Sequence, residues 1–423
     1  MSHSTKTDDK FFTPPLVIIF VTIFIDLVGF GIVIPLLTFY AEEFRATPLD
    51  IGLLVAVYSL MQFLFAPIWG SLSDKFGRRP VLFFTILGSS VGYLILGFAG
   101  SLLMVYVGRI IAGVTGGNLA TAQAYIADVT TRENRARGMG LFGMAFGLGF
   151  IVGPALAGIL SQFGMHVPFL FAAALSLVNA ILLYFILPES KHSDSHSAPD
   201  PRVGRMAALM NSLREPRFAT IAVDYFLIVM AFSMMTTSFA YFTLVNFGYD
   251  AAETGYLLGF VGLLAAVTQG VAFGGLVKRF GEAKLVIFGS AMLVLSLVAV
   301  PYVTSVSGGL LALLAGVGFF AIGNSIASPA LTSLASKIVG DSEQGRALGI
   351  LQSSASLARV VGPLLCGVLL NNAVQEVDEA SLVRTFWTAA GIMLIALLTA
   401  IYLSKIVHLP AAAPINLQPD DVV

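Results

Sequence analysis

Charged residues are scarce in this chain of 423 residues. Asp, Glu, Lys and Arg make up 11% of it, whereas soluble domains carry about 25%. Hydrophobic residues make up 57%, and the mean hydropathy is +0.89. This composition excludes an ordinary soluble protein and indicates an integral membrane protein.

The chain also lacks an excess of positive charge and a second cysteine. Its 23 Lys and Arg residues are balanced by 24 Asp and Glu residues, so no surface has the net positive charge that gathers phosphates, and we expect no nucleic-acid partner. The single cysteine, Cys366, excludes a disulfide within the chain and a thiolate metal site. We expect no bound metal.

The apolar stretches contain none of the residue patterns of intramembrane hydrolases. They show no His-Glu-x-x-His pattern, no paired helix aspartates and no Ser–His arrangement. An enzyme is therefore the least favoured function, and detection of a chemically altered product would be needed to revive it.

Twelve apolar stretches are each long enough to cross a bilayer, which takes about 20 residues. The first follows a polar segment without a small-residue cleavage site, so we predict an uncleaved helix there. The sequence thus predicts an all-α membrane protein of twelve spans. They are 14–40, 50–72, 80–99, 102–127, 136–161, 167–187, 218–246, 252–276, 283–304, 308–337, 345–371 and 382–405.

The Lys and Arg residues outside the spans lie almost entirely on one side of the membrane. Only Arg45 and Arg384 fall on the side opposite the N-terminus. Because basic residues accumulate in cytoplasmic loops, we predict that both termini are cytoplasmic.

The longest polar interval, 188–216, has no apolar period and predicts a cytoplasmic linker between an N-terminal bundle, 1–187, and a C-terminal bundle, 217–423. The two halves share glycines in the same order, which indicates an internal duplication. Gly70, Gly77, Gly153–Pro154 and Gly158 recur as Gly274, Gly281, Gly362–Pro363 and Gly367.

A charged loop follows the second span and is called the signature loop below. Its gating candidates are Gly70, Asp74, Lys75, Gly77, Arg78 and Arg79. Topology requires cations at such a place, but not an acid and glycines. We expect Arg78 or Arg79 to reach Asp128, and Asp74 to face the positive N-terminal end of the eleventh span, so that these contacts hold the cytoplasmic side closed. The alternative is that the cations only fix topology.

In the second half the corresponding loop departs from this pattern. Lys278 stands in place of Asp74, and Glu282 in place of Arg78. We therefore expect only the first half to form a complete latch.

Glycines four residues apart run along the fifth span. Gly149, Gly153 and Gly158 let another helix approach closely, while Pro154 removes a backbone hydrogen bond and favours a bend. Such a helix suits a seam between two bundles that rock against each other. A simple packing helix is the alternative.

Four stretches resemble the major facilitator superfamily, and within it the twelve-helix drug:proton antiporters similar to tetracycline exporters. They are Asp26 to Pro35, the signature loop, Gly108 to Gly113 with Ala124 to Asp128, and Gly149 to Gly158. The resemblance implies two pseudo-symmetric six-helix bundles with a substrate path between them. Its fifth-span segment is similar to the antiporter motif, which implies export.

The chain departs from the tetracycline exporters that it resembles. Those proteins carry acids at the places of Gly92 and Leu293, and a histidine at the place of Ala265. We therefore expect neutral, amphipathic or anionic cargo rather than tetracycline.

Four charged residues lie well inside the predicted spans, away from the first and last few residues of each, where an unpaired charge costs on the order of 3 kcal/mol or more. Asp26 lies in the middle of the first span, and an arginine that approached or left it would switch its proton on and off. Arg109 matches the family's fourth-span arginine, associated with proton coupling, so we expect it near Asp26 or else tied to backbone carbonyls. Arg359 would bind an anionic group or neutralise a carboxylate. Asp224 would either couple protons or extend to the cytoplasmic surface.

Uncharged polar residues on the spans that line the cavity in this family are candidate substrate contacts, or else hydrogen bonds between helices. They are Gln62, Asn118, Thr121, Gln123, Thr237, Tyr241, Asn246, Gln269, Asn324 and Ser328.

Together these observations predict a monomeric, proton-coupled exporter of small amphipathic compounds in the bacterial inner membrane. It would work by alternating access and would need no cofactor beyond the proton gradient. A uniporter or symporter of a sugar, organic anion or lipid-like metabolite is the alternative.

Overall fold

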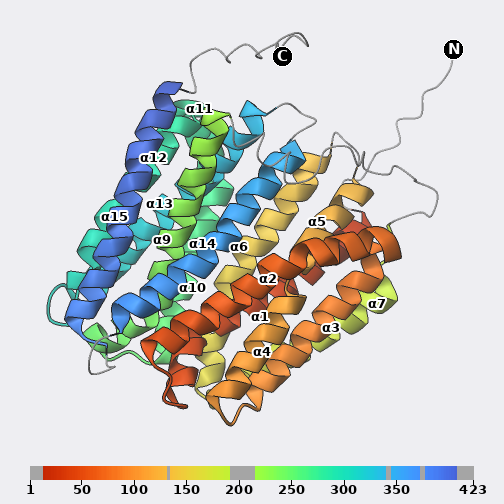
Figure 1. The fold of residues 1–423 in the computed structure, drawn as a ribbon, viewed down its shortest axis with the longest axis horizontal. Coiled ribbons are helices and arrows are strands. Elements are labelled where there is room, and N and C mark those ends of the chain that lie inside the picture. The colour runs from red at the N-terminus through yellow and green to blue at the C-terminus, as the bar shows by residue number, and fades with distance from the viewer. Residues whose placement is uncertain (1–12, 131–133, 191–214, 340–343, 372–376, 407–423) are drawn as a thin grey trace, which may run out of the picture.

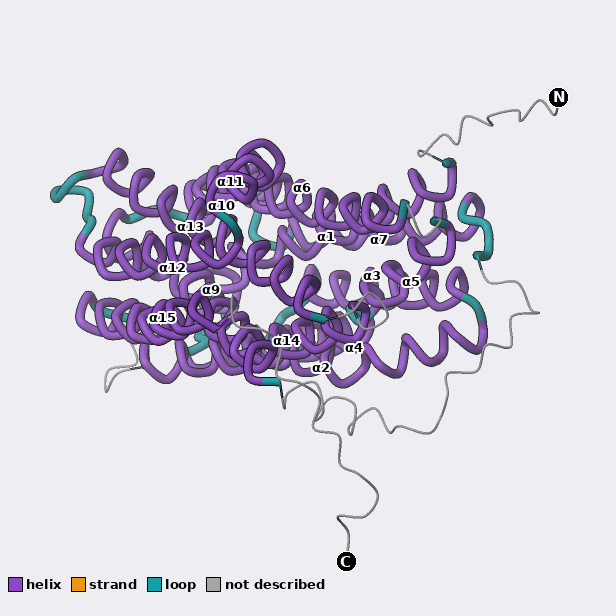
Figure 2. The backbone as a smooth tube through the Cα atoms, turned by 90° about the horizontal axis from the view of Figure 1, so that it is seen from above, coloured by secondary structure: helices purple, strands orange, loops and turns teal. Residues whose placement is uncertain are grey.

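A computed structural model describes residues 13–130, 134–190, 215–339, 344–371 and 377–406. Its described residues form helices and loops without a strand (Figure 2). Each predicted span is present. The helices are α1 (Pro14–Glu42), α2 (Pro48–Phe76), α3 (Arg78–Gly97), α4 (Leu102–Thr115), α5 (Asn118–Val129), α6 (Arg135–Ser161), α7 (Val167–Ile186), α9 (Pro216–Phe247), α10 (Ala251–Val267), η1 (Thr268–Ala272), α11 (Phe273–Phe280), α12 (Glu282–Ala299), η2 (Val300–Tyr302), α13 (Gly309–Ile338), α14 (Gln344–Leu370) and α15 (Glu379–Ile406).

Two of the predicted spans are interrupted helices. The fourth is divided into α4 and α5, and the eighth contains the π-helical turn η1 between α10 and α11. Eleven helices, counted across these interruptions, are long and apolar enough to cross a membrane. The remaining span is α6, of 27 residues.

The helices form two halves, α1–α7 and α9–α15, which are red to yellow and green to blue in Figure 1. Most of the predicted linker, 191–214, lies outside the described residues. The internal repeat is visible in the backbone: Gly77 ends α2 at φ 100°, and Gly281 ends α11 at φ 77°. Only glycine adopts these conformations at low cost, which explains why both loops contain it at this place.

The halves pack closely at the end where α1 ends and α2 begins, here called the closed end. A Cβ atom on Gly52 of α2 would lie 2.4 Å from the Pro363 carbonyl oxygen of α14. On the other side of the interface, a Cβ atom on Gly158 of α6 would lie 2.7 Å from the Ala252 carbonyl oxygen of α10. Backbone therefore meets backbone across the interface, as small residues permit in membrane proteins.

At the opposite end, which carries the signature loop, the halves are apart. A Cβ atom on Gly70, Gly147, Gly274 or Gly349 would meet no atom within 4 Å. Large side chains along this end of α10–α11 are exposed, with Val271 at 80%. The structure is therefore closed at one end and open at the signature-loop end.

Matched glycine substitutions test this arrangement. We expect Gly52→Ala to destabilise the protein by about 1–3 kcal/mol, because the added methyl group overpacks the α2–α14 contact. Gly70→Ala, at a position with open space, is the control and should leave stability unchanged or slightly higher. Thermal unfolding of the purified protein in detergent measures both, and equal melting temperatures would contradict the close contact.

Candidate functional site

Asp26 lies half-buried on α1, near Tyr58, which also interacts electrostatically with Arg359 of the other half. One of its carboxylate oxygens, Oδ2, accepts a hydrogen bond from Asn118 Nδ2 at 3.2 Å. Asn118 is buried at the first position of α5, directly after the break in the fourth span. The break thus places an amide donor, rather than a cation, against the acid.

The side chains of α2 hold this break in place. Gln62 donates to the Gly116 carbonyl oxygen at 2.8 Å, and Trp69 donates to the Val114 carbonyl oxygen at 2.6 Å. A Cβ atom on Gly117 would lie 2.9 Å from Ala66, so α2 approaches too closely for any larger residue. The backbone groups freed by the break are satisfied by side chains, as a membrane interior requires. Gln62, predicted as a cavity residue, is engaged in this structural role.

Arg109 is almost fully buried on α4, with 3% of its surface exposed. Its Nε donates to the Leu54 carbonyl oxygen at 3.2 Å, and its guanidinium lies 4.3 Å from the centre of the Tyr58 ring. No ion pair of the described residues joins Arg109 to Asp26, so the expectation that the two lie near each other for proton coupling stays a prediction. Tyr58 instead lies close enough to interact electrostatically with both. The alternative expectation, a tie to a backbone carbonyl, matches the geometry.

Arg359 on α14 is half-buried and has few partners. Its Nη2 lies 3.4 Å from Ser356 Oγ on the same helix, and no ion pair of the described residues includes it. It lies close enough to interact electrostatically with Tyr225 of α9 and Tyr58 of α2. Both predicted roles, an anion contact and a carboxylate counter-charge, remain predictions.

Asp224 is fully buried, and it faces α15 rather than extending to the surface. Its Oδ1 accepts a hydrogen bond from Thr399 on α15. Its Oδ2 is buried without a hydrogen-bond partner. The packing against α15 excludes the expected extension to the surface, and no contact joins Asp224 to Asp26 or Arg109 in the described residues.

The signature-loop contacts that the described residues show lie inside the N-terminal half. Arg78 lies 2.7 Å from Asp74 and 3.1 Å from Asp128, so the expected pair with Asp128 is present. Because α2, α3 and α5 belong to the same half, this pair is intact while the loop end is open. It therefore does not by itself hold that end closed, contrary to the simple latch. Asp74 was expected to face the N-terminal end of the eleventh span. Residues 340–343, directly before α14, lie outside the described residues, so this contact stays a prediction.

Glu189 is a loop partner that the motif does not reveal. Its carboxylate accepts hydrogen bonds from the backbone nitrogens of Arg78 at 2.8 Å and Arg79 at 3.2 Å. A Cβ atom on Gly77 would lie 2.5 Å from the same carboxylate. The Glu189 carboxylate caps the start of α3 and complements the helix dipole. Because the carboxylate lies so close to Gly77, a larger residue would not fit there. The other loop cation, Lys75, lies over the Phe76 ring.

The second half has a charge-reversed counterpart of the Arg78–Asp128 pair. Glu282 at the start of α12 pairs with Lys337 on α13, and Ser333 donates to Glu282 at 3.0 Å. The expectation that the second half lacks a complete contact is therefore wrong. Reversing the sign of both partners preserves the attraction, which a comparison of single positions does not reveal.

The predicted seam on α6 has two faces. Gly149 and Gly153 pack against Leu27 and Gly31 of α1, within the same half. Pro154 and Gly158 contact α10 of the other half, where a Cβ atom on Gly255 would lie 2.7 Å from the Pro154 carbonyl oxygen. Only the second pair therefore lies at the interface between the halves.

The other predicted cavity residues are dispersed. Thr121 and Thr237 are buried, Gln123 is half-buried and Gln269 is exposed on η1. Ser328 donates to Asn324 on the same helix at 3.3 Å. Asn246 donates to the Pro301 and Val303 carbonyl oxygens, which makes it a structural tie. Tyr241 lies at the closed end, beside a small cavity.

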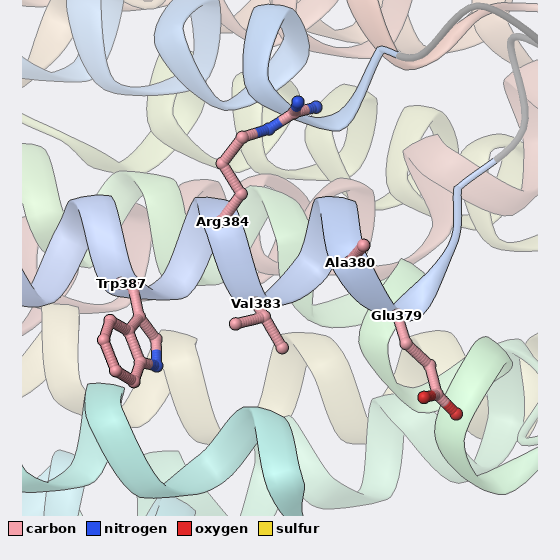
Figure 3. Close-up of a pocket in the computed structure, with 5 residues that line it drawn as sticks. All are labelled: Glu379, Ala380, Val383, Arg384 and Trp387. Carbon is pink, nitrogen blue, oxygen red and sulfur yellow. The ribbon is translucent and has the colours of Figure 1, made fainter.

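One pocket lies away from these residues. A groove of about 570 Å³ follows the start of α15 and is lined by Glu379, Ala380, Val383, Arg384 and Trp387 (Figure 3). Trp387 packs edge-on against Tyr302 at 6.4 Å. Aromatic residues at helix ends are typical of membrane–water interfaces, so we assign the groove to lipid contact. The described residues contain no cluster of His, Cys, Asp and Glu that could hold a metal ion.

Comparison with known proteins assigns the family. The family model of the Major Facilitator Superfamily matches residues 19–363 and 225–418. The chain belongs to this superfamily. Solved structures share the fold, among them a bacterial homologue of the human lysosomal transporter Spinster, at a TM-score of 0.77 and 14% identity, covering 92% of this chain and 96% of that one. The human organic anion transporter MFSD10 matches with a TM-score of 0.68 and 23% identity, covering 92% and 99%.

Several sequence relatives are resistance proteins. The chain is 34% identical to the class C tetracycline resistance protein of Escherichia coli, over 83% of this chain and 88% of that protein. It is 32% identical to the class D protein of Salmonella ordonez, over 94% and 99%. Multidrug resistance protein 2 of Bacillus subtilis is 28% identical, over 84% and 88%.

The two arginines should differ in their effect on stability. We expect Arg109→Lys to destabilise the protein by about 1–2 kcal/mol, because lysine cannot both contact the Leu54 carbonyl oxygen and stack on the Tyr58 ring. Arg359→Lys, which loses one long hydrogen bond, is the matched control and should change stability little. Thermal unfolding in detergent measures both, and equal losses would contradict the difference in packing.

Proposed function

We propose that this chain is a proton-coupled secondary transporter that exports small amphipathic compounds by alternating access. The observation that carries the proposal is Asp26, a half-buried acid on α1 that neither Arg109 nor Arg359 neutralises here. An ionised carboxylate without a cation is costly inside a membrane. A neutral amide partner therefore suits an acid that gains and loses a proton as the halves move.

The open and closed ends support transport from the signature-loop end towards the closed end. We infer that the signature-loop end is cytoplasmic, because the basic residues gather there, and that the protein lies in a bacterial inner membrane. Cargo would enter from this end and displace the proton from Asp26. After the halves rock, a proton from outside would return to Asp26 as the cargo leaves. Arg109, which packs on the Tyr58 ring, would lower the free-energy cost of the ionised Asp26 carboxylate.

The relatives support export of a toxic compound, since their names describe resistance. The packing argues against tetracycline itself. A Cβ atom on Gly92 would lie 2.9 Å from the Ala112 backbone nitrogen, and Leu293 is 1% exposed. These positions, where the resembled exporters carry acids, are filled by helix packing in this chain. We therefore propose amphipathic compounds other than tetracycline.

Transport in everted membrane vesicles tests the coupling. A compound found by screening a growth-resistant strain should accumulate when a proton gradient is imposed, and Asp26→Asn should abolish this accumulation. The variant should still exchange labelled for unlabelled compound without a gradient, because exchange requires no net proton transfer. Glu379→Gln, which neutralises an exposed acid on α15, is the control and should transport normally. Gradient-driven accumulation by Asp26→Asn would refute the role of Asp26.

Arg359 favours a second candidate, transport of an organic anion by uniport or symport. Its guanidinium lacks an acidic partner among the described residues, and such groups bind carboxylates and phosphates well. An anion near Asp26 would strengthen proton binding, whereas a competing exported compound would weaken it.

The direction of proton movement on binding distinguishes the two candidates. We expect the purified protein in weak buffer to release protons when cargo is added, because cargo and proton compete at Asp26. Asp26→Asn should show no such release. Proton uptake by the wild-type protein, lost in Arg359→Gln, would instead support the anion symporter.

A further inference from the structure

The closed end contains an acid that lies in the contact between the halves. A cavity of about 180 Å³ lies between the halves and is lined by Glu42, Ala46 and Pro48 from the N-terminal half, by Tyr241, Leu244 and Val245 from α9, and by Val377. Glu42 is the last residue of α1, and Tyr241 lies within α9. Both side chains line the cavity, one from each half, and the hydroxyl of Tyr241 is buried without a hydrogen-bond partner among the described residues. The acid of one half thus meets the phenol of the other.

Glu42 has no cation to neutralise it among the described residues. None of their ion pairs includes Glu42, and it is half-buried, whereas the adjacent Glu43 is exposed. The described titratable groups that interact with Tyr241 are Glu42 itself, Cys366 of α14 and Asp50 of α2. None of these is a cation.

Asp50 is already engaged in other contacts. Its carboxylate accepts hydrogen bonds from Thr47, where it completes the cap of α2, and from Tyr106 of α4. Asp50 therefore has a structural role at this end, while the carboxylate of Glu42 is left facing the partner half.

Closing this end moves Glu42 from water to a small cavity. An ionised carboxylate loses solvation there without gaining a cation, whereas a protonated carboxyl group carries no charge and loses much less. Closure should therefore be tighter when the acid carries a proton. Opening the same end would return the acid to water and release the proton.

We propose that Glu42 is a second proton-binding site, which takes a proton from the outer solution and thereby favours closure of the outer end against Tyr241. The inference rests on the proposed inside–outside orientation, but not on the role of Asp26. It adds a proton-dependent gate about 24 Å along α1 from Asp26, given a helical rise of 1.5 Å per residue.

Distances between spin labels across the closed end test this site. Labels on Arg45 and Leu244, introduced as cysteines in a Cys366→Ala background, should report a closed population that grows as the pH falls. Glu42→Gln mimics the protonated acid and should remain closed at all pH values. Glu43→Gln, on the exposed neighbouring acid, is the matched control and should follow the parent protein.

Two further variants separate this site from the proposed transport cycle. Tyr241→Phe keeps the ring but removes the one donor that the ionised acid could meet, and should lower the closed population more at high pH than at low pH. Asp26→Asn should keep the pH-dependent closure even if it abolishes coupled transport. Unchanged pH dependence in Glu42→Gln would overturn the proposal, while failure of the Asp26 experiment alone would refute only the coupling.

Discussion

The side chain of Tyr58 lies close to three charged groups in the membrane interior. Asp26, Arg109 and Arg359 all interact with it electrostatically. Arg109 is held by the Tyr58 ring and by the Leu54 carbonyl oxygen. Asp26, by contrast, accepts a hydrogen bond from the Asn118 amide, and Arg359 makes one long hydrogen bond to Ser356. Because charge without a partner is expensive at this depth, these two groups are the ones to which we assign new partners in our proposal: a proton for Asp26 and an anion for Arg359.

The rest of the fold holds Tyr58 and the charged side chains around it in place. The break between α4 and α5 brings Asn118 to Asp26 and is possible because Gly116 and Gly117 let α2 approach. At the closed end, the glycine contacts of α2 with α14 and of α6 with α10 bring the halves together through backbone surfaces that have little side-chain freedom to lose. The Arg78–Asp128 pair and its charge-reversed counterpart, Glu282–Lys337, each join helices of a single half.

Much of the fold follows from the sequence because hydropathy reports directly on the spans. All twelve spans and their order are correct, and the repeated loop glycines have similar backbone conformations at Gly77 and Gly281. Charge partners are harder to predict. Arg109 bonds a backbone carbonyl, and such a contact has no sequence signal. Glu189 follows the last helix of the N-terminal half, so its contact with the signature loop is not visible in the motif. The Glu282–Lys337 pair keeps the attraction of Arg78–Asp128 with both charges reversed, which a comparison of single positions misses. Which face of α6 meets which helix also depends on tertiary packing that glycine spacing alone does not determine.

The most direct test of this account is an infrared difference spectrum of the purified protein, which detects the C=O stretch of protonated carboxyl groups. The band assigned to Asp26 is the one that disappears in Asp26→Asn. The account predicts that this band is present in the open state described here and weakens when cargo is added at constant pH. A band that does not respond to cargo, or the absence of any band that depends on Asp26, would contradict the claim that this acid exchanges its proton during transport.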